Sequence, residues 1–212
     1  MINIKTLTHQ IFCVCLILLF AASCTSKPIS FTNDEIETVN KYSQKMRVLL
    51  TTDKSDSLFL RQQAKDFSDA DLQSDIFKNL KTQMLFTVQD TANTGVGIAA
   101  PQVGISRRLI AVQRFDKPDE PFEFYANAYI VYYSDEKRIG AEGCLSIPDW
   151  RGNVERSETI VIKYIDTENL KPRTDTVSGF TAVIFQHEVD HLDGVLFIDK
   201  LYTPSDCGND NQ

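Results

Sequence analysis

Two histidines near the end of the chain, His187 and His191, stand four residues apart, with Glu188 between them. On an α-helix, side chains at this spacing lie on one face, so both imidazoles can bind the same metal ion. Glu188 lies one step round the helix, where its carboxylate can reach a water molecule bound to that metal. The residues therefore indicate a hydrolytic metal site, in preference to a surface helix with two solvated imidazoles.

A catalytic site of this kind usually has three protein ligands and one position for water. The chain after His191 holds no further histidine or glutamate, and its carboxylates include Asp193, Asp199 and Asp206. Asp193 is too close to His191 to fold back easily, and Asp199 sits in a predicted strand segment. We therefore expect the third ligand to come from an earlier part of the chain.

One upstream candidate is Cys144, in the run EGCLSIP at 142–148. A cysteine next to glycine and shortly before proline indicates a thiolate held on an irregular turn. Free cysteines are also commonly buried as ordinary apolar residues, and a disulfide to Cys207 is a further alternative. The presence of a two-histidine helix that lacks a third ligand favours metal binding by Cys144.

A third segment, GVGIAAPQVG at 95–104, combines glycines with small residues that allow a close approach of its backbone. It lacks the Lys-Ser/Thr ending of a phosphate-binding loop. The side-chain amide of Gln102 can donate a hydrogen bond to a developing oxyanion. Together with the other two segments, it indicates one catalytic site built from three parts of the chain.

These three segments resemble the signature motifs of the peptide deformylase family, and the resemblance runs from about Arg47 to about Leu201. It implies that Cys144, His187 and His191 bind one divalent metal ion, with water as the fourth ligand. The family metal is typically Fe(II), which Zn, Ni or Co can replace, and a Cys-His-His set suits several of these ions.

The same resemblance implies hydrolysis of the formyl group of an N-formylmethionyl peptide, with release of formate. Glu188 is then the general base and later the general acid, while the Gln102 side chain and the Leu145 backbone N–H stabilise the oxyanion. Substrate-binding positions are carried over in the same way. Val96, Ile98, Val183 and Ile184 are expected to line the methionine pocket, and the backbone at Gly97 to pair with the peptide.

Some of these assignments have alternatives. Ordinary core packing is a close alternative for Ile98 and Ile184. The chain also departs from the family pattern at Ala128, where proline is more usual after Asn127, and at Trp150. Because these two positions concern loop shape and the rim of the pocket, they bear on substrate preference and not on the reaction.

Two other classes of function compete with this interpretation. A zincin-like metallopeptidase predicts a third ligand after His191, where the candidates are poor. A non-catalytic envelope lipoprotein that binds formyl peptides is expected to have lost the base or a ligand, whereas all of these residues are present.

The spacing of apolar residues predicts the elements that position the site. Helices are expected at 34–50, at 69–90 and from near Thr181 to Leu192. Gly194, just after the last of these, is expected to stop it. Strands are expected at 108–114, 153–166, 174–178 and 195–198, with one or two more within 122–133 and a hairpin connection at 169–172. The pattern predicts an α+β fold, with antiparallel strands wrapped around a central metal-binding helix, as in the peptide deformylase-like fold.

The N-terminal segment resembles a bacterial lipoprotein signal. An apolar run at 11–22 is too short to span a bilayer comfortably, and Ala21-Ala22-Ser23-Cys24 resembles a lipobox. We expect a signal peptide at 1–24 with a lipidated Cys24, a tether at 25–32, one catalytic domain at 33–203 and a polar tail at 204–212. Simple signal cleavage or an uncleaved anchor is the alternative.

The lipoprotein-type signal predicts that the enzyme is lipid-anchored in the cell envelope. Its substrates there would be released formyl peptides or signal-peptide fragments. A cytoplasmic location is expected instead if the segment is not a functional signal. The composition, 42% hydrophobic and 24% charged, is typical of one globular domain. A net charge of −7 without any basic run excludes nucleic acid as a partner, and we expect a monomer or weak oligomer.

Overall fold

The computed structural model describes residues 30–92 and 95–203. The predicted signal peptide, Cys24, most of the tether, and the tail with Cys207 lie outside the described residues. In the part of the chain that is described, no helix has both the length and the apolar character needed to cross a membrane.

Five α-helices, seven strands and two 3₁₀ helices make up the described ranges 30–92 and 95–203. The helices are α1 (Asn33–Asn40), α2 (Lys54–Leu60), α3 (Asp69–Gln73), α4 (Asp75–Val88) and α5 (Gly179–Leu192). The strands are β1 (Gly97–Ala99), β2 (Leu109–Gln113), β3 (Phe122–Tyr133), β4 (Lys137–Cys144), β5 (Ile147–Ser157), β6 (Thr159–Asp166) and β7 (Pro172–Ser178). The 3₁₀ helices are η1 (Ala100–Val103) and η2 (Phe197–Lys200).

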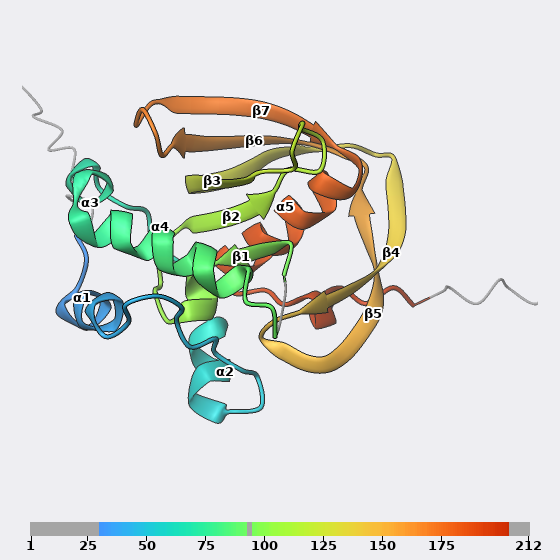
Figure 1. Ribbon diagram of the computed structural model, residues 1–212. Coiled ribbons are helices and arrows are strands. Elements are labelled where there is room, and N and C mark those ends of the chain that lie inside the picture. Colours follow the sequence, from blue (N-terminus) through green and yellow to red (C-terminus); the bar gives the residue numbers. More distant parts are fainter. Residues whose placement is uncertain (1–29, 93–94, 204–212) are drawn as a thin grey trace, which may run out of the picture.

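The strands form two antiparallel sheets. One has five strands in the order β1-β2-β3-β6-β7, and the other is the long β4–β5 hairpin. Figure 1 shows α1–α4 gathered on one side of the molecule and the hairpin on the other, with α5 and the five-stranded sheet between them. Because α5 packs against both sheets, the predicted α+β arrangement of strands around a central helix is confirmed.

Helix α5 is buried on almost every side, which is why its apolar residues form no single stripe. Phe185, Val189 and Leu192 pack into the core beneath the five-stranded sheet. The helix ends as predicted, because Gly194 follows it with a φ of +73° in the left-handed region. A Cβ at this position would clash with the Arg61 carbonyl, so glycine is required there.

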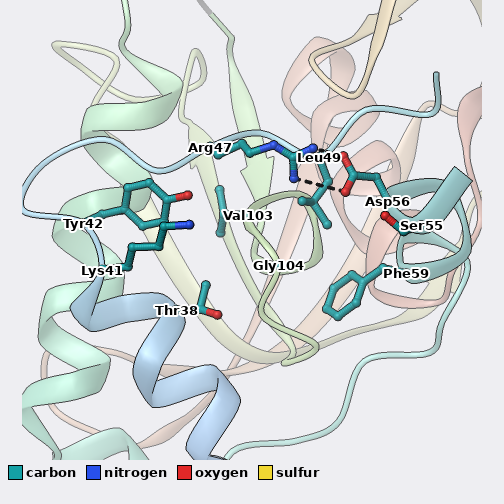
Figure 2. A pocket seen from close by; sticks show the side chains of 10 residues that line it. All are labelled: Thr38, Lys41, Tyr42, Arg47, Leu49, Ser55, Asp56, Phe59, Val103 and Gly104. Atoms are coloured by element: carbon teal, nitrogen blue, oxygen red, sulfur yellow. Dashed lines mark hydrogen bonds and ion pairs between the residues drawn. The ribbon is translucent and has the colours of Figure 1, made fainter. Parts of the chain in front are cut away.

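The extended segment between α1 and α2 is hydrogen-bonded to two of the motif segments. The backbone N–H of Leu49 donates to the Gln102 carbonyl, and that of Thr51 donates to the Ser146 carbonyl. This extended segment therefore connects the first and second motifs. A cavity of about 360 Å³ lies beside it, and Figure 2 shows Arg47 paired with Asp56 at its edge.

Several predicted element boundaries were wrong. The helix expected at 34–50 ends at Asn40, because residues from Met46 onward hydrogen-bond to Thr87 and to the first motif instead. The helix expected at 69–90 is broken at Ser74, which caps α4 through a hydrogen bond from the Phe77 N–H. Local capping thus divided one apolar pattern into two helices.

Two strand predictions also need correction. The strand expected at 153–166 is two strands, β5 and β6, which meet at Glu158 and belong to different sheets. The closing strand expected at 195–198 is absent, and η2 takes its place, with Asp199 accepting a hydrogen bond from the Leu196 N–H. The strand at 122–133 and the β6–β7 hairpin agree with the prediction.

Candidate active site

The three predicted metal ligands meet at one point. His187 and His191 lie on α5, and Cys144 is the last residue of β4, just before the turn at Leu145 and Ser146. One ligand atom from each of the three residues lies within 4.8 Å of the others, and Cys144 Sγ is 3.2 Å from His191 Nε2. Among the described residues, this is the group of His, Cys, Asp and Glu side chains that can hold a metal ion.

The donor set fits a divalent metal. With metal–sulfur and metal–nitrogen bonds of about 2.3 and 2.0 Å, tetrahedral ligand atoms lie roughly 3.3–3.6 Å apart, close to the observed Sγ–Nε2 distance. The downstream carboxylates are engaged elsewhere, since Asp193 accepts from Arg108 at 2.7 Å and Asp199 pairs with Arg61. Among the described residues, the grouping of Cys144 with the two histidines is therefore in keeping with an upstream third ligand, which stays a prediction.

A network of ion pairs, buried at Arg156 and partly exposed at Lys200, surrounds the histidines. Arg156 donates to Glu142 at 2.8 and 3.0 Å and to Asp190 at 2.5 Å, and Lys200 donates to Asp190 at 2.6 Å. Glu142 Oε2 lies 2.8 Å from His187 Nδ1. A carboxylate on Nδ1 leaves Nε2 of the same ring to face a metal, and it holds the ring in orientation.

The electrostatics of this network favour a cation. Burial raises the pKa of Glu142, but hydrogen bonds from His187 and Arg156 outweigh it and lower the pKa to about 2. Burial lowers the pKa of His187, but hydrogen bonds to Cys144 and Glu142 raise it to about 10. Burial also lowers the pKa of His191 well below its usual range, which keeps that imidazole neutral. Without a metal, Cys144 and Glu142 thus favour a positive charge on His187, while His191 stays neutral.

Glu188 is buried in the wall of the cavity next to His187. Its Oε2 atom has no hydrogen-bond partner among the described residues. Burial raises its pKa to about 7, against the opposing charge of His187. Gly97 allows this close packing, since a Cβ there would lie 2.5 Å from Glu188 Oε1 and 2.8 Å from Ile184.

Gln102 is held with its amide nitrogen toward the metal ligands. Its Oε1 accepts a hydrogen bond from the Ala99 N–H at 2.8 Å, which fixes the orientation of the amide. Its Nε2 is then 3.5 Å from Cys144 Sγ and 3.3 Å from Ser146 Oγ. The side chain is 2% exposed, so this donor is set in place before a ligand arrives.

A cavity of about 760 Å³ opens beside these residues. Val96, Gly97, Val183 and Ile184 line it together with Gln102, Leu145, His187 and Glu188, as the predicted substrate-binding roles require. Ile98 is the exception among the predicted residues. It is fully buried in the core cluster with Leu109 and is not among the lining residues, so core packing accounts for it.

Two residues of the network were not identified from the sequence as site residues. Glu142 was part of the second motif, but no role was given to it, and Arg156 lies outside all three motifs. A signal for Arg156 was present in the alternation of β5, where it falls on the same face as buried Val154. A charged residue at an inward position of a strand predicts a buried partner.

Known proteins of one family match this chain in sequence and in structure. The family model described as polypeptide deformylase matches residues 46–206. A peptide deformylase of Leptospira biflexa is 38% identical over 149 residues, which cover 67% of this chain and 82% of the relative. One from Synechocystis is 41% identical over 146 residues, covering 68% and 75% of the two chains. A Met-Ala-Ser-bound class I type b peptide deformylase from Acinetobacter baumannii has a TM-score of 0.66 and 36% identity, covering 76% of this chain and all of that one.

Proposed function

The chain belongs to the peptide deformylase family, and from this premise we propose which of its residues carry out the reaction. It is a metal-dependent hydrolase that removes the formyl group from the amino terminus of N-formylmethionyl peptides. The proposed assignment rests mainly on one observation, the meeting of Cys144, His187 and His191 within 4.8 Å beside a cavity lined by Glu188.

Cys144, His187 and His191 hold the metal in this proposal. A divalent ion bound there supplies an activated water and polarises the formyl carbonyl. Fe(II) is the proposed native ion, with Zn, Ni or Co as replacements, since one thiolate and two imidazoles suit all of them. Metal analysis of protein purified without oxygen tests this identity, and a dominant ion with oxygen-only preference, such as magnesium, contradicts it.

Glu188 is the proton-transfer group in this proposal. Its unpartnered Oε2 atom in the cavity wall can accept a proton from the attacking water and then deliver it to the amine that leaves. Because the carboxylate is enclosed, no other group among the described residues competes for that oxygen. The roles of general base and general acid therefore fall to one side chain.

Gln102 and Leu145 stabilise the oxyanion. The amide of Gln102 is fixed by Ala99, which leaves Nε2 beside Cys144, where charge grows on the carbonyl oxygen. Leu145 lies in the turn that follows Cys144 and lines the same cavity, so its backbone N–H is close to the same point. Donors held in place beforehand do not need to reorganise during the reaction.

The methionine side chain occupies the apolar part of the cavity, formed by Val96, Val183 and Ile184. The backbone beside Gly97 pairs with the extended peptide. The relative from Acinetobacter baumannii supports this extension to the present chain, because Met-Ala-Ser is bound in its structure.

The direct test is release of formate from formyl-Met-Ala-Ser by the purified, metal-loaded protein. Acetyl-Met-Ala-Ser serves as the matched control, because it has the same peptide but a larger acyl group. We expect formate release that stops when a chelator removes the metal and returns when the metal is restored. Cleavage of an internal peptide bond, with the formyl group retained, would contradict the proposal.

We further propose that the protein is attached to the envelope membrane by a lipid on Cys24, as a monomer or weak oligomer. The lipobox-like Ala21-Ala22-Ser23-Cys24 after an apolar run supports this, although these residues lie outside the described ranges. Cell fractionation of the wild type and of Cys24→Ala is the test. Equal recovery of both forms in the cytosol would contradict the proposal.

A further inference from the structure

Three large apolar side chains at the catalytic cavity are exposed to solvent. Val96 is 38% exposed, Trp150 52% and Phe180 50%, and all three line the cavity that contains Cys144 and Glu188. They come from three elements, the segment before β1, the start of β5 and the first turn of α5. We call Val96, Trp150 and Phe180 the apolar rim, in which Val96 also borders the proposed methionine pocket.

The two aromatic rings of the rim are supported from behind. The Trp150 ring lies 6.4 Å from the ring of Phe197, which in turn stacks on His187 at 6.1 Å. The Phe180 ring lies 5.3 Å from the partly buried ring of Phe115. Each ring therefore has one supported side, and about half of its surface remains open to a ligand.

The cavity has room for more than the methionine side chain. Its volume of about 760 Å³ is in the range of pockets that enclose a whole drug-sized molecule. A bound peptide in extended form advances about 3.3 Å per residue, so the residues after methionine pass the mouth of the cavity. Exposed apolar side chains gathered at such a mouth mark a surface that a ligand covers.

We propose that the apolar rim selects formyl peptides with a large apolar or aromatic residue immediately after the methionine. This inference rests on the proposed deformylase reaction and names a preference within its substrate class. Aromatic side chains of the peptide gain from contact with the rings of Trp150 and Phe180 as well as from loss of apolar surface to water. The preferred substrates are then hydrophobic peptides, such as fragments of apolar segments.

The test compares three C-terminally amidated peptides, because Arg151 also lines the cavity and could attract a free carboxylate at the peptide end. They are formyl-Met-Ala-Ser, formyl-Met-Phe-Ser and formyl-Met-Ala-Phe. With the wild-type protein, we expect kcat/KM to be roughly 5- to 10-fold higher for formyl-Met-Phe-Ser than for formyl-Met-Ala-Ser, and formyl-Met-Ala-Phe to stay close to formyl-Met-Ala-Ser. In Trp150→Ala and Phe180→Ala, this ratio should fall toward one.

Tyr132→Ala is the matched control, because Tyr132 is 53% exposed on β3 and does not line the cavity. It should keep the wild-type ratio. A wild-type ratio near one for formyl-Met-Phe-Ser, or a gain confined to formyl-Met-Ala-Phe, overturns the rim proposal while deformylation stands. Failure of the metal-loaded wild type to deformylate any of the three peptides overturns the proposed function itself.

Discussion

Two buried arginines, Arg107 and Arg156, form similar ion-pair networks, but only the network of Arg156 includes a candidate metal ligand. Arg107 is 1% exposed and Arg156 is 3% exposed, and both donate to a buried glutamate. Arg107 pairs with Glu35 of α1 and lies against the rings of Phe31 and Phe67 at 5.4 and 5.9 Å. Its network joins α1, which precedes the family match at 46–206, to the rest of the fold.

The network of Arg156 extends to the candidate metal ligands. Through Glu142 it reaches His187, beside the thiol of Cys144. Three buried side-chain atoms lack a hydrogen-bond partner within the described ranges, and two of them, Glu188 Oε2 and His191 Nδ1, are at this site. A buried ion pair alone therefore does not mark an active site, whereas unpartnered polar atoms beside soft donors and a cavity do.

The largest expected effect is at Glu188, the group that most clearly distinguishes the two networks. We expect Glu188→Gln to lower kcat by about 10²- to 10⁴-fold, because the general base is lost while the shape of the side chain is kept. Metal content should remain at the wild-type level, which mass spectrometry can measure. Near-wild-type kcat in this variant would remove Glu188 from the mechanism.

Gly97→Ala tests the packing around the same carboxylate. The added Cβ meets Glu188 Oε1 at 2.5 Å, so Glu188 or the strand must move. A displacement of about 1 Å can cost roughly 100-fold in rate, and we expect a loss of that order in kcat. Gly140→Ala is the control, since nothing lies within 4 Å of a Cβ at that position. Equal kinetics for the two variants would contradict the placement of Glu188.

A paired substitution tests the contrast between the arginines directly. Arg156→Met should weaken metal binding by about 10- to 100-fold, because Glu142 no longer holds His187 in the same way. Arg107→Met should leave metal affinity unchanged. Both should lower the free energy of unfolding by about 3–5 kcal/mol, because each removes the buried guanidinium that neutralises a buried carboxylate. Titration with the metal and chemical denaturation give the two quantities, and equal metal affinities would break the contrast.

The smallest effect is expected at the outer end of the catalytic network. Lys200 is 42% exposed and pairs with Asp190, which Arg156 also neutralises. Lys200→Met should therefore change the free energy of unfolding by about 0–1 kcal/mol and leave metal affinity within a few-fold of wild type. A loss as large as that of Arg156→Met would show that Lys200 belongs to the inner network.

The sequence predicted the parts of the site that depend on local spacing. The four-residue interval of His187 and His191 required a helix, and Gly194 correctly marked its end. The lack of suitable donors downstream also led to Cys144 as a candidate ligand, and its sulfur does lie beside the two imidazoles. These features lie within single segments, so their spacing carries the information.

The features that the sequence did not predict depend on contacts between segments that are far apart in the chain. Arg156 and Glu142 are 14 residues apart and meet through the register of β4 and β5. Glu35 and Arg107 are 72 residues apart, and no local pattern connects them. The same cause shortened the predicted helix at 34–50, where tertiary hydrogen bonds from Met46 and Leu49 replaced helical ones.

The central claim is that Cys144, His187 and His191 bind one divalent ion, and X-ray absorption at the edge of the bound metal tests it most directly. The account predicts one ion per chain, with one sulfur at about 2.3 Å and two imidazole nitrogens at about 2.0–2.1 Å. A first coordination shell without sulfur, or one that is unchanged in Cys144→Ser, would contradict it.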